Sequence, residues 1–140
     1  QALCALRPGL KFALDPRLAE MDFGDWENRR WSELGRDAID AWTADFAAHR
    51  CGGGESVTGL LARVASALDA ACCRGDDVLW VTHAGVARAV RLLLASPPAP
   101  LTAAAWPREA PAFGAFECIV LDPDPVRARL RENAHAPGCS

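Results

Sequence analysis

Several features are absent from this 140-residue chain, and each absence argues against one class of protein or partner. No apolar run is long enough to cross a membrane, so we expect a soluble protein. The formal net charge is −3 and the arginines are scattered, which argues against nucleic acid as a partner. Only three histidines are present, and no pair of Cys or His residues has the spacing of zinc ligands. No Gly-x-Gly-x-x-Gly follows a predicted strand, so a dinucleotide site is not expected.

The sequence also lacks the arrangement of a disulfide-stabilised domain, although it contains six cysteines. They are Cys4, Cys51, Cys72, Cys73, Cys118 and Cys139. Cys72 and Cys73 are adjacent near a predicted helix end, and Cys118 lies within an apolar run. We therefore expect reduced thiols in a cytoplasmic protein.

Composition and length indicate one globular domain. Hydrophobic residues make up 51% of the chain and charged residues 24%, which argues against disorder. We expect the domain to cover residues 1–125, followed by a polar tail over residues 126–140. The chain starts at Gln1, and residues 2–6 resemble the last turn of a helix whose beginning is absent. A preceding strand and helix are therefore expected to be missing.

The most informative stretch is 76–94, DDVLWVTHAGVARAVRLLL. Residues 78–81 are apolar, with β-branched and aromatic members, and predict a buried strand. After His83, Ala84 and Gly85, apolar residues at helical spacing predict a helix. The pattern places an imidazole where open α/β sheets bind ligands, beside helix N–H groups that favour phosphate. A structural role for His83 is the alternative.

The remaining pattern predicts an α/β fold with a largely parallel sheet. Two further strands are expected at residues 11–14 (KFAL) and 116–121 (FECIVL). Helical periodicity marks residues 39–50 and, most clearly, residues 57–72, where Ser56 can cap the helix. In that helix Arg63 and Asp69 are expected to point outward. The segment 96–111 predicts a loop anchored by Leu101 and Trp106.

Two loops stand out. Residues 17–26 (RLAEMDFGDW) place acidic side chains among aromatic ones, either as part of a site or as solvated acids of a packed loop. Residues 52–54 are three consecutive glycines, which serve either as a plain hinge or as a backbone that approaches a ligand. The residue pattern alone leaves both choices open.

Three ordered blocks resemble the histidine phosphatase superfamily, the phosphoglycerate-mutase-like group. They are LAEMDFGDWEN (18–28), GGGES (52–56) and VTHAGVAR (81–88). The first block is most similar to small phosphatases that include the α-ribazole phosphatases of cobalamin synthesis, although Asn28 stands where they usually have Gly. The resemblance spans about residues 3 to 121 and implies a three-layer fold with a largely parallel sheet.

The resemblance also implies roles for individual residues. Glu20 would be the proton donor and His83 the second histidine of a metal-free phosphoryl-transfer site that needs no cofactor. His83, Ala84 and Gly85 would bind the phosphoryl group of a small phosphorylated metabolite. A possible substrate rim comprises Trp26, Gly54, Glu55 and Ser56.

The sequence departs from the family at the nucleophile. The attacking histidine of the family lies in an Arg-His-Gly triplet, and His49, His83 and His135 are not in such a triplet. The chain as given is therefore expected not to turn over by the family mechanism. A phosphatase whose nucleophile lies outside this chain is the preferred hypothesis. A catalytically inactive, truncated relative or a phosphate-binding module is the alternative.

Overall fold

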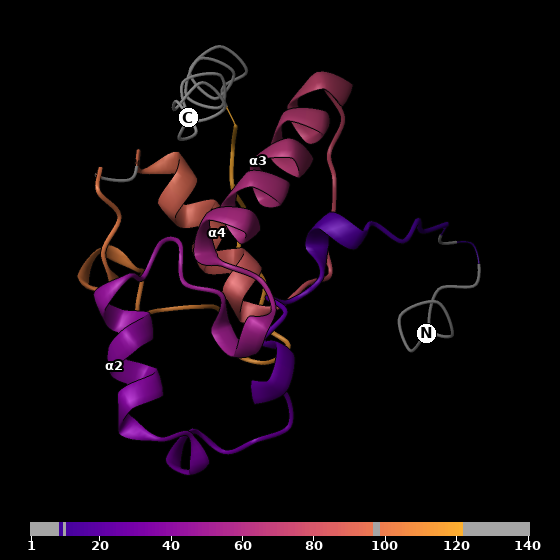
Figure 1. The fold of residues 1–140 in the computed structure, drawn as a ribbon. Coiled ribbons are helices and arrows are strands. Elements are labelled where there is room, and N and C mark those ends of the chain that lie inside the picture. Colours follow the sequence, from indigo (N-terminus) through magenta and orange to yellow (C-terminus); the bar gives the residue numbers. More distant parts are fainter. Residues whose placement is uncertain (1–8, 10, 97–98, 122–140) are drawn as a thin grey trace.

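The computed structural model describes residues 9, 11–96 and 99–121 (Figure 1). The described elements are η1 (Pro16–Leu18), η2 (Gly24–Trp26), η3 (Trp31–Glu33), α2 (Arg36–Ala44), η4 (Cys51–Gly53), α3 (Val57–Arg74), α4 (Ala84–Leu94) and η5 (Ala103–Ala105), where η denotes a short 3₁₀ helix. The helical turn expected at residues 2–6 and the expected tail 126–140 lie outside the described residues.

The longest helix, α3, confirms the strongest periodic pattern of the sequence. It begins after Ser56, whose hydroxyl oxygen accepts a hydrogen bond from the Gly59 N–H at 3.2 Å. It ends at Gly75, whose φ of +69° is the left-handed conformation typical of a helix C-terminus. Its apolar face is buried, and complete burial of the Leu60 side chain contributes about 2 kcal/mol.

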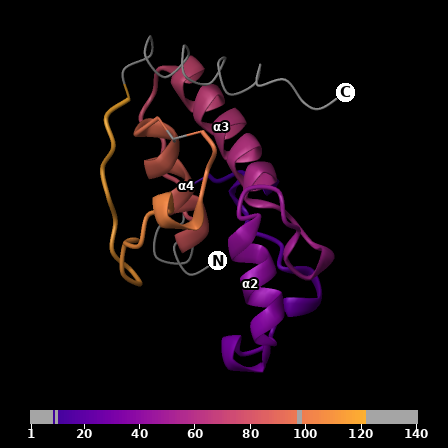
Figure 2. The ribbon, with the colours of Figure 1, turned by 60° about the vertical axis from the view of Figure 1, so that its left-hand side comes forward.

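The helix predicted after Gly85 is also present, as α4. Its buried face includes Val86, Ala89, Val90 and Leu93, and it packs against α3. Met21, Phe46 and Cys51 extend this core from the preceding segments. Figure 2 separates the helices, with α4 beside α3 and α2 beyond the N-terminal end of α3. Trp106 and Leu101 pack on the core, as expected for the anchors of their loop.

The predicted sheet is wrong for the described part of the chain, which contains helices, turns and extended segments but no strand (Figure 1). Residues 11–14, 78–81 and 116–121 contain no strand, and no backbone ladder joins them. Several of their apolar residues are exposed to solvent, and the exposed fraction is 70% for Leu79 and 88% for Phe116. Apolar, β-branched runs favour extended backbone, whereas a strand also requires a hydrogen-bonded neighbour. The core instead forms between the apolar faces of α3 and α4.

Burial makes Cys51 a structural thiol. Its side chain is fully buried, and desolvation raises the pKa of the thiol to about 11. Because the thiolate is the reactive form, Cys51 stays protonated and unreactive at neutral pH. We expect iodoacetamide to label the exposed Cys118 in the folded protein and to label Cys51 only after denaturation. Peptide mapping checks this, and equal labelling rates for both cysteines in the folded protein would contradict it.

Candidate active site

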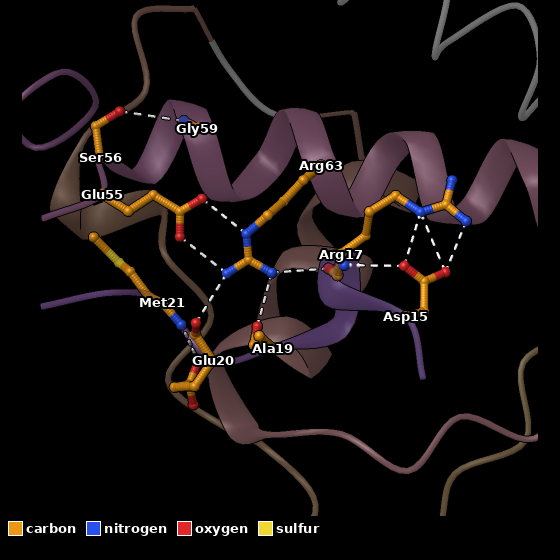
Figure 3. A network of polar contacts seen from close by, with 9 residues as sticks. All are labelled: Asp15, Arg17, Ala19, Glu20, Met21, Glu55, Ser56, Gly59 and Arg63. Atoms are coloured by element: carbon orange, nitrogen blue, oxygen red, sulfur yellow. Dashed lines mark hydrogen bonds and ion pairs between the residues drawn. The ribbon is translucent and has the colours of Figure 1, made fainter. Parts of the chain in front are cut away.

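The predicted acidic loop is anchored to α3 where η1 begins. Asp15 caps η1 by accepting a hydrogen bond from the Arg17 N–H at 3.0 Å. The Arg17 guanidinium also forms an ion pair with Asp15 at 2.7 Å and holds the pKa of that carboxyl below its usual value. A further bond from Arg17 Nη1 reaches the Ser66 carbonyl of α3 at 3.0 Å. Figure 3 shows Asp15 and Arg17 alongside α3.

Arg63 of α3 is the centre of this polar network (Figure 3). Its guanidinium donates to both carboxylate oxygens of Glu55, at 2.8 and 2.9 Å. It also donates to the carbonyl oxygens of Arg17, Ala19 and Glu20, at 2.8, 2.7 and 3.0 Å. The expectation that Arg63 points outward is therefore wrong. Bidentate pairing with Glu55 fixes the guanidinium plane, and its remaining N–H groups hold the backbone that carries Glu20.

The other side of this backbone is held by the segment before α4. The Thr82 hydroxyl donates to the Leu18 carbonyl at 2.7 Å. The Gly85 N–H, in the first turn of α4, donates to Glu20 Oε2 at 3.1 Å, and the Met21 N–H donates to Glu20 Oε1 at 2.9 Å. The first and third sequence blocks therefore meet, although Glu20 and Gly85 are 65 residues apart.

This meeting depends on the glycine at position 85. A Cβ atom on Gly85 would lie 2.1 Å from Glu20 Oε1, so any other residue would displace the carboxylate. The negative charge of Glu20 is placed favourably at the N-terminus of α4. The Gly85 N–H, one of the expected phosphate donors, is thus occupied here by Glu20. A phosphate oxygen that binds this N–H must displace or share the place of the carboxylate.

His83 and Ala84 stand at the same helix start. His83 is the N-cap residue of α4 and is exposed, as is Ala84. The His83 side chain makes no capping hydrogen bond, so it does not satisfy the helix end itself. His83 is exposed to solvent, and it precedes by less than one helical turn the Gly85 N–H that binds Glu20. The structure thus brings the Glu20 carboxylate to the N-terminus of α4, whose N-cap residue is His83.

The expected rim residues are engaged within the protein. Glu55 binds Arg63, and Ser56 caps α3. Trp26 packs against Trp42 and His49, with ring centroids 6.1 and 6.4 Å apart. The backbone of the glycine run contacts the acidic loop, since the Glu55 N–H donates to the Asp22 carbonyl at 2.7 Å.

The backbone of the glycine run lies very close to the backbone of the acidic loop, a role that neither interpretation from the sequence included. A Cβ on Gly52 would lie 2.3 Å from the Phe23 carbonyl oxygen, and one on Gly54 would lie 2.3 Å from the Asp22 carbonyl oxygen. Gly24 approaches Gly52 equally closely from the other side. The run thus packs η4 directly on η2.

Two cavities share Glu20 as a wall residue. The first, about 330 Å³, is also lined by Gly54, Glu55, Arg50 and Arg63. The second, about 410 Å³, is also lined by Gly85, Arg88 and a group of aromatic side chains. Neither of these two cavities is lined by His83, Trp26 or Ser56 among the described residues. Glu20 thus lies between a charged cavity and a mostly apolar one that includes five aromatic side chains.

Comparison with known proteins identifies the family of the chain. The family model of the histidine phosphatase superfamily (branch 1) matches residues 1–108. The chain belongs to this superfamily, and its membership indicates a phosphatase-type function. No curated protein matches the chain, and no solved structure matches it. None of the described helices is both long and apolar enough to cross a membrane.

Proposed function

We propose that the chain supplies the phosphate-binding and proton-donating parts of a phosphomonoesterase site. Glu20 would protonate the leaving oxygen, and His83, Ala84 and Gly85 would hold the phosphoryl group. The substrate would be a small phosphate monoester, such as α-ribazole 5′-phosphate, in the cytoplasm. The observation that carries the proposal is the 3.1 Å contact between Glu20 and the Gly85 N–H, which joins the acidic loop to the helix after His83.

The chemistry of phosphoryl transfer fits these residue types. Catalysis depends mostly on positioning and on stabilising charge at the phosphoryl oxygens. A helix N-terminus and an imidazole both serve that purpose. An alkoxide leaving group also needs a proton from a nearby acid, which Glu20 would provide in its protonated form. The site as proposed uses no metal or other cofactor.

The attacking group is a separate question. The 140 residues contain no Arg-His-Gly triplet. Among the described histidines, His49 is not in such a triplet and its ring packs beside Trp26, so we do not propose it as a replacement. This observation favours a second candidate, a phosphate-binding module without turnover. Release of phosphate from a monoester by the purified chain would exclude the second candidate. Binding without release would support it.

The site proposal itself is tested by binding, which both candidates require. We expect His83→Ala to weaken binding of inorganic phosphate about tenfold, because a charge-assisted hydrogen bond is lost. His49→Ala is the matched control and should leave the affinity unchanged. Isothermal titration calorimetry measures both. Unchanged affinity in His83→Ala, or an equal loss in both variants, would refute the assignment.

A further inference from the structure

The second cavity beside Glu20 has walls that suit a flat ligand. Five aromatic side chains line it: Phe23, Trp31, Trp42, Phe46 and Trp106. They come from the acidic loop, from the segment around α2 and from the loop after α4. Its volume of about 410 Å³ lies in the range of small-molecule sites. The site proposal so far assigns no role to this cavity.

The rings are held in fixed relative positions before any ligand binds. Trp31 and Trp42 are stacked, with centroids 5.9 Å apart and planes at 11°. Phe46 stacks on Trp42 at 5.6 Å, and Phe23 meets the edges of Trp31 and Trp42. Trp31 nevertheless remains 57% exposed. A preformed aromatic surface that is partly open to solvent favours stacking with a planar group.

Two wall residues also carry unsatisfied donors. Trp42 Nε1 and Arg88 Nε are buried, and neither finds a hydrogen-bond partner among the described residues. Arg88 also donates from Nη2 to the Arg108 carbonyl at 3.3 Å, which keeps the guanidinium in the wall. Buried donors without partners are costly, so a ligand that supplies acceptor atoms would be favoured.

We propose that this cavity binds the leaving group of the monoester, and that this group carries a planar aromatic ring with hydrogen-bond acceptors. The proposal rests on the proposed function, because Glu20 and Gly85 line the same cavity and connect it to the phosphate site. The ring stacks against the tryptophans, and a small shift of the Trp42 and Arg88 side chains brings their buried Nε1 and Nε donors to its acceptors. These residues thereby determine which monoester is selected.

Three non-hydrolysable probes test the proposal on the chain as it exists. They are methylphosphonate, naphthylmethylphosphonate and quinolinylmethylphosphonate, which add a ring and then a ring nitrogen to the same anionic group. We expect the naphthyl probe to bind about tenfold more tightly than methylphosphonate, and the quinolinyl probe to bind more tightly still. Isothermal titration calorimetry gives the three affinities.

Two variants localise the effect. Trp31→Ala removes an exposed wall of the cavity. We expect it to abolish most of the additional affinity that the ring gives the naphthyl and quinolinyl probes and to leave the affinity for methylphosphonate unchanged. Phe113→Ala is the control, because Phe113 is fully exposed and is not a cavity residue. Circular dichroism confirms that each variant is folded, and if Trp31→Ala is not, the three-probe series on the unaltered chain still decides the matter.

The outcomes separate this inference from the proposed function. If methylphosphonate binds and the ring adds nothing, the cavity proposal is overturned while the phosphate site stands. If free quinoline binds in a way that depends on Trp31 but methylphosphonate does not bind, the phosphate site fails and the aromatic cavity stands as a ligand site. An equal loss of ring-dependent affinity in Phe113→Ala would also overturn the cavity proposal.

Discussion

Glu20→Gln is expected to lower the hydrolysis of alkyl phosphate monoesters by roughly 10²- to 10⁴-fold, the usual contribution of a general acid. The loss should be much smaller for nitrophenyl phosphate, whose leaving group needs little protonation. Gln retains one of the two oxygen acceptors of Glu20, so one of the N–H bonds from Met21 and Gly85 persists and the other is lost. Initial rates with both substrate types give the comparison when they are measured for the unaltered and Glu20→Gln forms of a polypeptide that also contains the attacking histidine.

Glu27→Gln is the matched control for this prediction. Glu27 directly follows the acidic loop and also accepts a backbone hydrogen bond, from the Phe23 N–H at 2.9 Å, but it lines neither cavity at Glu20. Glu27→Gln should leave the ratio of the hydrolysis rates of alkyl and nitrophenyl esters unchanged. Equal losses for alkyl and nitrophenyl esters in Glu20→Gln would argue that Glu20 positions the loop and does not donate the proton.

Gly52→Ala is expected to be among the most destabilising single changes in the chain, at about 2–5 kcal/mol. The cost has two parts, left-handed backbone strain and overpacking against the Phe23 carbonyl. Gly53→Ala isolates the first part, because Gly53 also has a positive φ, +78°, but has open space where a Cβ would lie. It should cost about 1–2 kcal/mol.

Urea denaturation of both variants gives the free energies of unfolding. The difference between Gly52→Ala and Gly53→Ala measures the close approach of η4 to η2. If the two variants are equally stable, the acidic loop is not held by this glycine contact. A dominant contribution from Arg63 and Thr82 would then be indicated.

Local sequence signals correctly predicted α3 and α4, whereas the helical periodicity expected over residues 39–50 corresponds only in part to α2, which spans Arg36–Ala44. Ser56, the apolar spacing after it and Gly75 act within a few residues of α3, so the pattern suffices. The strands could not be predicted in the same way. Residues 78–81 have a typical strand composition, yet pairing is a long-range property that depends on which segment lies beside them. That information is not contained in the local run.

The residues of the candidate site likewise fall into two groups, those with a local sequence signal and those without one. The blocks containing Glu20 and His83 were recognisable because they are short and ordered in sequence, and the contact of Glu20 with Gly85 then followed in the structure. Arg63 was misjudged because its backbone partners lie 43–46 residues away, where helical periodicity carries no information. Thr82 gave no signal either, since its partner, the Leu18 carbonyl, is 64 residues distant.

The central claim is that the acidic loop and the start of α4 form one phosphate site. Backbone amide NMR of the chain, titrated with inorganic phosphate, tests it most directly. The account predicts saturable shifts at Ala84 and Gly85 and, in the same titration, at Met21, whose N–H binds the Glu20 carboxylate. Saturable shifts confined to other parts of the chain, or none at these three amides, would contradict it.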